Sequence, residues 1–203
     1  FCVNNTKQDY GNYEEVKVDW KQEYPDAQEE VPTNAPKALG STVRITCYVD
    51  SDHAHDTVTR RSVTGFIIIL NSMPFIWYSK RQGSVESSTY GAEFIATRTA
   101  VEHLKGVRFS LRMLGISLDE PCIVFGDNLA VVTNATEPAS MLKKKHLGIS
   151  YHLVREAVAA GIITVYHISS EENPANPLTK SEKVANLKII EEMFFYPGYE
   201  RST

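Results

Sequence analysis

The stretch VRITCYVDSDHA, residues 43–54, alternates apolar and polar side chains and closes with two carboxylates. The alternation has the two-residue period of a β-strand, and its apolar face consists of Val43, Ile45, Cys47 and Val49. Asp50 and Asp52 stand where this strand is expected to leave its sheet. Asp and Ser favour turns, so a solvated turn is one interpretation of the pair. A divalent-cation site is the other, and the rest of the chain decides between them.

Four more strands are predicted further along the chain. The runs SVTGFIIIL (62–70) and PFIWYSK (74–80) are rich in β-forming residues, and the short break between them predicts a hairpin. CIVFGDN (122–128) and IITVYHIS (162–169) each read as a strand that follows a helical stretch. Three hairpin-linked strands followed by two strands entered through helices predict an α/β fold, with a five-stranded mixed sheet flanked by helices.

Apolar residues at helical spacing predict four helices. The first covers 87–115, with Leu114 among its inward residues and with Ser87, Ser88 and Thr89 available as caps rather than as a nucleophile. A second follows Asn128, which can cap it. The third covers 142–161, and its expected inward residues are Leu142, Ile149, Leu153 and Ala157. The last is expected to begin at Pro174 with Asn173 as its cap.

Length and composition indicate one globular domain with extensions. The chain has 203 residues, of which 42% are hydrophobic, and a formal net charge of −4. Residues 1–41 are acidic and rich in proline, so we interpret them as a linker or surface arm, followed by a main domain over 42–181 and a helical tail over 182–203. No apolar run approaches the roughly 20 residues of a membrane span, and no signal peptide is evident, so we expect a soluble intracellular protein. Cys47 and Cys122 lie in strand-like runs and are expected to be buried free thiols.

Acidic residues recur at the ends of predicted elements. Asp50 ends the first strand, Glu93 lies in the first turns of the long helix, and Asp127 ends the fourth strand. A mixed sheet can bring these ends to one edge, where three carboxylates would repel one another unless a hard cation neutralised them. Two Mg²⁺ ions roughly 4 Å apart, held by such carboxylates, activate a water and stabilise the leaving oxygen in phosphodiester hydrolysis.

An ordered set of motifs resembles a known family. YVDSDHAHDTVTRRSVTGFII, WYSKRQGSVESSTYGAEFIA, VFGDN, LKKKHLGISYHLVRE and NPANPLTK are similar, in this order and spacing, to the ribonuclease H (RNase H) domain of copia-type retrotransposon Pol polyproteins. The similarity covers about residues 43–181, and the acidic arm before it resembles the segment that joins the reverse transcriptase to this domain. The resemblance implies an RNase H-like fold and metal-ligand roles for Asp50, Glu93 and Asp127.

Two positions depart from the pattern of that family. Asn176 stands where the family usually has Asp, which would be the fourth metal ligand, and Gly148 stands where the family usually has an acid. An amide oxygen can coordinate a hard cation but supplies no negative charge. We therefore retain Asn176 as a candidate catalytic and metal-binding residue, with weakened metal affinity expected. An inactive copy of the element is the alternative.

Basic residues provide candidates for gripping nucleic acid, because a hybrid is held by its backbones rather than read by sequence. The candidates are Arg60, Arg61, Lys80, Arg81, Lys143, Lys144, Lys145 and His146. A solvated helix face is the alternative for the run that ends at His146.

Other polar and aromatic residues have less specific interpretations. Asp52 could orient a metal-bound water or belong to a turn. His53 and His55 could form part of a zinc site, but no Cys or His lies at zinc-finger spacing from them. For Trp77 and Tyr78 we expect at least one to be a core residue rather than a base-stacking platform. Structural roles are expected for His152 and His167.

The sequence therefore predicts a metal-dependent endonuclease that cleaves the RNA strand of RNA–DNA hybrids, with two Mg²⁺ or Mn²⁺ ions as cofactors. The expected partners are the hybrid and the reverse transcriptase domain of the same polyprotein, and the expected location is cytoplasmic, in retrotransposon particles. Two alternatives stay open. One is a catalytically inactive module that binds nucleic acid or polymerase, and the other is an integrase-like enzyme that cuts DNA.

Overall fold

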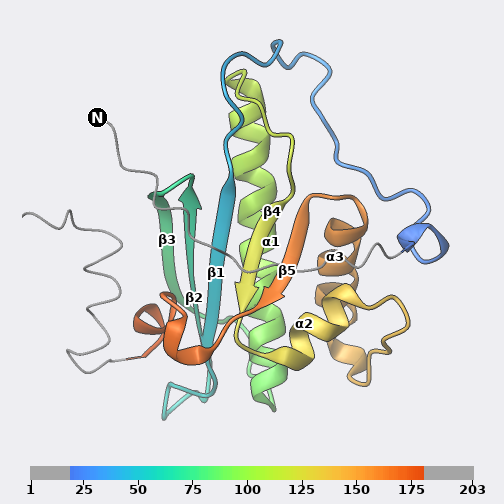
Figure 1. Cartoon of the computed structure of the whole chain (residues 1–203). Coiled ribbons are helices and arrows are strands. Elements are labelled where there is room, and N and C mark those ends of the chain that lie inside the picture. Colours follow the sequence, from blue (N-terminus) through green and yellow to red (C-terminus); the bar gives the residue numbers. More distant parts are fainter. Residues whose placement is uncertain (1–18, 181–203) are drawn as a thin grey trace, which may run out of the picture.

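The core of the protein is a mixed five-stranded sheet with the strand order β3-β2-β1-β4-β5 (Figure 1). The computed structural model describes residues 19–180. The strands are β1 (Ile45–Asp52), β2 (Val63–Leu70), β3 (Met73–Arg81), β4 (Cys122–Gly126) and β5 (Ile163–His167). β1 pairs antiparallel with β2 and parallel with β4, and β4 pairs parallel with β5. The predicted α/β class and five-stranded mixed sheet are confirmed.

β1 is the central strand, and its side chains are buried on both faces of the sheet from Ile45 to Ser51. It begins two residues later than the sequence predicts, because the Val43 amide donates to Ser117 O at 3.1 Å instead of joining the ladder with β2. It also ends later, at Asp52, which is paired with Val63. Asp50 therefore lies within the strand, where its pairing with Gly65 of β2 fixes its backbone, one residue beyond the last pair with β4 at Val49.

Three helices cover one face of the sheet: α1 (Thr89–Met113), α2 (Leu129–Thr136) and α3 (Gly148–Ala159) (Figure 1). Ser88 Oγ accepts from Gly91 N at 3.2 Å and Asn128 Oδ1 accepts from Val131 N at 3.2 Å, so both predicted caps are confirmed. The apolar core lies between these helices and the sheet. Its fully buried members include Phe66, Phe94, Leu104, Val124 and Val154.

Two of the predicted helices differ at their ends. Leu114 is 74% exposed, because α1 ends at Met113 and Gly115 turns the chain away with a φ of +73°. The third helix begins at Gly148 instead of at residue 142, and Ile149, which was expected to point inward, is 75% exposed. The preceding lysines cannot extend the apolar face of α3, and Lys144 instead reaches Ser88 Oγ at the start of α1.

The segment after β5 crosses the other face of the sheet, where Ala175 and Leu178 pack on Tyr48, Ile67 and Phe125. The predicted helix from Pro174 is wrong within the described residues. Asn173 does not cap a helix. Its Nδ2 donates to Val49 O at 2.8 Å and its Oδ1 accepts from Ala175 N at 3.0 Å. The chain forms one-turn 3₁₀ helices at Ser170–Glu172 and Asn176–Leu178, and the predicted tail over 182–203 lies outside the described residues.

The described part of the arm, from Asp19 onward, lies against the helices. Glu29 contacts Arg108 and Arg112 of α1, and Leu39 forms a parallel bridge with Ile116. Farther toward the amino terminus, the ring of Trp20 lies 4.9 Å from the guanidinium of the buried residue Arg155 in α3.

The predictions for cysteines and membrane spans can be compared with residues 19–180. Cys47 and Cys122 are buried free thiols, as predicted, and Cys2 lies outside the described residues. No helix in this part of the chain combines the length and hydropathy that a membrane crossing needs.

Candidate metal centre

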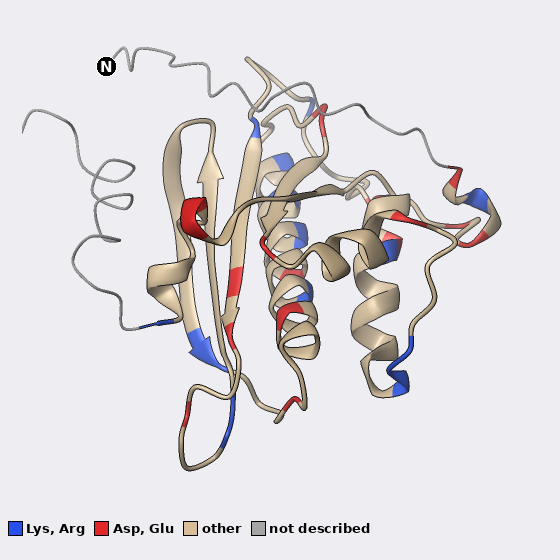
Figure 2. Cartoon of the chain, turned by 60° about the horizontal axis from the view of Figure 1, so that its bottom comes forward, with Lys and Arg blue, Asp and Glu red and all other residues tan. Residues whose placement is uncertain are grey.

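Three carboxylates from distant parts of the chain meet beside β1. Asp50 lies in β1, Glu93 in the second turn of α1, and Asp127 directly after β4. One oxygen of each lies within 4.8 Å of one oxygen of the other two. Figure 2 shows the acidic positions of β1 and of the facing turn of α1 side by side. The convergence that the element ends predicted is therefore present in the structure.

Two of these carboxylates are buried, and Asp127 is half-buried. Asp50 is 1% exposed and Glu93 is 8% exposed. Burial raises the pKa of Glu93 to about 9, with further contributions from the charges of Asp50 and Asp127. Burial also raises the pKa of Asp50, although the hydrogen bond from Thr179 opposes the rise. The two groups would be costly to keep ionised without a counter-charge.

The donor set fits a hard divalent cation. Asp50 Oδ1 is buried and has no hydrogen-bond partner, so one oxygen of this carboxylate is available as a ligand. All three side chains offer oxygen atoms, which Mg²⁺ and Mn²⁺ prefer. Within residues 19–180, this is the one group of three or more His, Cys, Asp or Glu side chains that could hold a metal ion.

Neighbouring groups hold each carboxylate in place. Ser51 N donates to Glu93 Oε1 at 3.2 Å, Ser170 Oγ donates to Asp127 Oδ2 at 2.7 Å, and the Thr179 hydroxyl donates to Asp50 Oδ2. Sequence reasoning missed Ser170 and Thr179 as parts of the site. The available signal was a cluster of hydroxyl residues in the segment after the last strand, close to the proposed ligand position 176.

Asn176 lies at the edge of the centre and differs from its predicted placement. It opens the 3₁₀ helix Asn176–Leu178, and its Nδ2 donates to Ser170 O. Its Oδ1 is buried and has no hydrogen-bond partner. Asn176 O also accepts from the Thr179 amide at 3.1 Å. Asn176 thus connects Ser170, which bonds to Asp127, with Thr179, which bonds to Asp50. Its role as a metal ligand remains a prediction.

Asp52 and the two histidines after it have partners of their own. Asp52 Oδ2 pairs with His55 Nδ1 at 2.5 Å, and the His53 ring contacts Glu86 O at 2.9 Å. Asp52 is not a member of the carboxylate group. The structural roles expected for two other histidines agree with their contacts, which are Tyr24 OH for His152 and Asp127 O for His167.

The predicted nucleic-acid contacts fall into two groups. Arg60 and Arg61 lie in the β1–β2 loop, and β2–β3 pairing places Lys80 and Arg81 opposite residues 64 and 63, next to that loop. Arg81 is paired with Asp56, so part of its charge is already compensated. This first group lies at the end of the sheet where β1 reaches Asp52.

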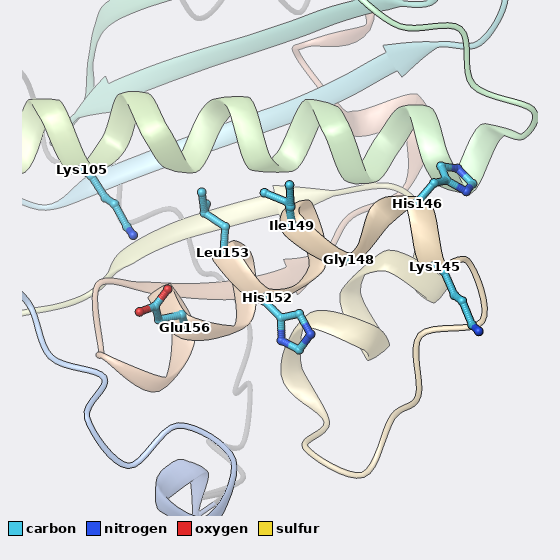
Figure 3. A pocket seen from close by; sticks show the side chains of 8 residues that line it. All are labelled: Lys105, Lys145, His146, Gly148, Ile149, His152, Leu153 and Glu156. Carbon is cyan, nitrogen blue, oxygen red and sulfur yellow. The ribbon is translucent and has the colours of Figure 1, made fainter.

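The second group is the run Lys143–His146, which lies ahead of α3, with its last two residues in the one-turn 3₁₀ helix Lys145–Leu147. Lys145 and His146 line an open pocket between α1 and α3, together with Lys105 (Figure 3). His146 Nε2 lies 3.0 Å from the buried carboxylate of Glu86. Gly148 also lines this pocket, and a Cβ at that position would meet no atom within 4 Å.

Of the two aromatic residues in β3, one is exposed and the other packs on the core, as expected. Trp77 is 65% exposed, whereas Tyr78 stacks on the buried Phe66 with ring centroids 4.6 Å apart.

Comparison with known proteins gives the relatives of the chain. No protein-family model matches it. The chain is 32% identical over 141 residues to the retrovirus-related Pol polyprotein from transposon RE2 of Arabidopsis thaliana, covering 70% of this chain and 10% of that protein. It is 35% identical over 155 residues to the corresponding polyprotein from transposon TNT 1-94 of Nicotiana tabacum, covering 76% and 12%. This chain is a homologue of plant copia-type Pol polyproteins.

The chain spans about a tenth of the length of the curated relatives that it matches. Its fold is that of RNase H. The structure of LC11-RNase H1 in complex with an RNA/DNA hybrid has a TM-score of 0.53 and 18% identity to this chain, covering 67% of this chain and 94% of that one. At this identity the similarity concerns the fold, and it agrees with the strand order described above.

Proposed function

We propose that this chain is a metal-dependent endonuclease that cleaves the RNA strand of RNA–DNA hybrids during retrotransposon reverse transcription. The observation that carries the proposal is the convergence of Asp50, Glu93 and Asp127, whose oxygens lie within 4.8 Å of one another. The RNase H fold and the Pol relatives support a nuclease in general terms.

The residues of the centre would hold divalent ions, in keeping with the expected pair of Mg²⁺ or Mn²⁺ ions. Bound divalent ions supply an activated water and stabilise the charge of the leaving oxygen. Asp50 would contribute Oδ1, and Asp127 would contribute the oxygen that Ser170 leaves free. Glu93 would bind as the anion, losing the proton that its raised pKa retains in the metal-free protein. Asn176 Oδ1 would add a neutral donor.

Basic residues on two sides would grip the hybrid. We assign phosphate contacts to Arg60, Arg61, Lys80 and Arg81 at one end of the sheet and to Lys143–His146 ahead of α3. Contacts of this kind position a duplex without reading its sequence. The solved LC11-RNase H1 complex with an RNA/DNA hybrid has the same fold, which supports this partner.

The test is cleavage of a labelled RNA–DNA hybrid by the purified chain with Mg²⁺, with Mn²⁺ and with a chelator. Asp127→Asn is expected to lower the rate by more than about 100-fold, because changes in the outer shell of a metal site already cost 10–100-fold. Asp26→Asn is the matched control, since it makes the same isosteric change at an exposed position in the arm. Metal-independent cleavage, or full activity of Asp127→Asn, would refute the mechanism.

A second candidate function is a hybrid- or polymerase-binding module without catalysis. The observation that favours it is Asn176, which brings an amide where the family resemblance expects a carboxylate. Hybrid binding without turnover at any Mg²⁺ or Mn²⁺ concentration would establish this alternative. Cleavage of duplex DNA would instead indicate the integrase-like enzyme.

The wider context is also proposed. We infer that residues 1–41 connect this unit to a reverse transcriptase, that residues 42–181 form the nuclease domain, and that 182–203 form a tail. The relatives are Pol polyproteins, which supports a reverse transcriptase partner and a cytoplasmic retrotransposon particle as the place of action. Co-purification of the chain with a co-expressed reverse transcriptase domain, with and without residues 1–41, tests the connection.

A further inference from the structure

A lysine contacts the carboxylate centre. Lys180 Nζ lies 3.7 Å from Asp50 Oδ2. The Asp50 side chain is 1% exposed and that of Lys180 is 39% exposed, so the ammonium approaches the buried carboxylate from the solvent side. Within the described part of the chain, this is the one ion pair that any of Asp50, Glu93 and Asp127 forms.

The backbone that carries Lys180 is tightly held. The amides of Thr179 and Lys180 both donate to Asn176 O, at 3.1 and 3.2 Å. The Thr179 hydroxyl lies 2.9 Å from the same oxygen and also reaches Asp50 Oδ2. Thr179 is buried at 4% exposure, and Gly65 of β2 leaves room for its methyl group. The backbone of Lys180 is therefore held in a fixed position beside the three carboxylates.

The two oxygens of Asp50 have different surroundings. Oδ2 receives the Thr179 hydroxyl and the Lys180 ammonium, whereas Oδ1 is buried without a hydrogen-bond partner. Opposite charge near a group of carboxylates reduces their mutual repulsion. The ammonium supplies such a charge to the metal-free centre.

We propose that Lys180 is the internal counter-ion of the Asp50, Glu93 and Asp127 centre and that divalent ions bind in competition with it. The inference rests on the proposed metal-binding function of that centre. In this role Lys180 is a positioning residue, since it acts through Asp50. It sets the divalent-ion concentration at which the centre fills.

The competition has two measurable consequences. Removing the ammonium makes the metal-free protein less stable, because the carboxylates lose a counter-charge. It also makes metal binding tighter, because the entering cation no longer meets or displaces a positive charge. A lysine with a purely structural role would lower stability without tightening metal binding.

The experiment compares the native chain with Lys180→Met, Lys180→Arg and Lys37→Met. Isothermal titration with MgCl₂ and MnCl₂ measures the dissociation constant, and thermal unfolding in chelator measures the stability of the metal-free protein. Lys180→Met is expected to bind Mg²⁺ about 3- to 10-fold more tightly and to melt at a lower temperature in chelator. Lys180→Arg keeps the charge and should behave as the native chain. Lys37→Met removes one charge from an exposed arm position and should also leave both values unchanged.

The outcomes separate this inference from the proposed function. An unchanged or weaker affinity of Lys180→Met, with metal binding intact in the native chain, overturns the counter-ion role alone. The absence of Mg²⁺ and Mn²⁺ binding in the native chain overturns the metal centre as well. If Lys180→Met does not fold, Lys180→Gln replaces it in the same measurements, because glutamine is also neutral and is more hydrophilic than methionine.

Discussion

Glu29 and Arg108 lie 79 residues apart in the chain and form a two-bond ion pair, with Arg108 Nε to Glu29 Oε1 and Nη2 to Oε2 both at 2.7 Å. Arg112 Nη2 adds a third contact to Glu29 Oε2 at 2.6 Å. The Arg108 side chain is 4% exposed, so water cannot replace the carboxylate if it is removed. The arm is thus attached to α1 by a largely buried charge pair.

Glu29→Gln should lower the free energy of unfolding by about 2 kcal/mol at pH 7, because it leaves the guanidinium of Arg108 without its anion. Urea unfolding of both proteins measures the loss. Glu30→Gln is the control, since Glu30 is the exposed neighbour and should change stability by less than about 0.5 kcal/mol.

The same pair predicts the pH dependence of stability. Burial raises the pKa of Glu29, but the hydrogen bonds from Arg108 and Arg112 outweigh it and lower the pKa from 4.5 to about 2. A lowered pKa in the folded state stabilises the protein above pH 4.5, and this stabilisation is lost as the pH falls toward 2. The difference between the native chain and Glu29→Gln should therefore be constant at neutral pH and shrink in that acidic range. An equal difference at pH 3 and pH 7 would contradict the assignment.

Gly65→Ala should destabilise the protein by about 1–3 kcal/mol through overpacking. A Cβ at position 65 would lie 2.6 Å from Thr179 Cγ2 and 3.2 Å from Ala175 O, so Thr179 must move away from Asp50. We also expect weaker Mg²⁺ binding in the variant. Thermal unfolding and metal titration measure the two effects. Gly83→Ala meets no atom within 4 Å and serves as the matched control.

Ser170→Ala should weaken Mg²⁺ binding and hybrid cleavage by about 10-fold, as is typical when a partner of a metal ligand is lost. The change removes the 2.7 Å hydrogen bond that orients Asp127 Oδ2. Ser170 is exposed, so the melting temperature should change little. Ser169→Ala, at the exposed neighbouring position, should leave both metal affinity and rate unchanged; an equal loss there would exclude a specific role for residue 170.

Asn176→Asp should shift the Mg²⁺ dependence of cleavage to lower concentration without changing hybrid affinity in chelator. The new carboxylate adds negative charge next to the centre, but it replaces the amide that donates to Ser170 O. Without metal the variant should therefore melt at a lower temperature than the native chain, and Mg²⁺ should remove this difference in melting temperature. Superimposable Mg²⁺ titrations of the cleavage rate would mean that residue 176 is not a ligand position.

Local patterns predicted the sheet and the caps because these depend on nearby residues. The alternation around Cys47 identified the central strand, and Ser88 and Asn128 are caps as their positions indicated. Ile149 was misplaced because its helix begins only at Gly148, and the residues before it contact Ser88 and Glu86 instead of extending the helix. Such contacts join residues more than 50 positions apart, and helical periodicity does not contain them.

In the candidate site, too, local patterns predicted some features, whereas contacts between distant residues decided the others. The positions of Asp50, Glu93 and Asp127 at element ends predicted their convergence, which the structure contains. Asn173 was interpreted as a helix cap because Pro174 follows it, yet its amide donates to Val49 O, 124 residues earlier. The roles of Ser170 and Thr179 depend on how the last segment crosses the sheet, and no pattern near these residues describes that crossing.

The contact between Thr179 and Asp50 spans 129 residues of chain. During synthesis at about 5–20 residues per second, β1 leaves the ribosome on the order of ten seconds before the segment that completes its site. For that interval the centre has neither its hydroxyl nor its lysine, and β4, the parallel neighbour of β1, is also made late. The contacts of Asp50 with Thr179 and Lys180 can consequently form only when nearly all of this unit has been made.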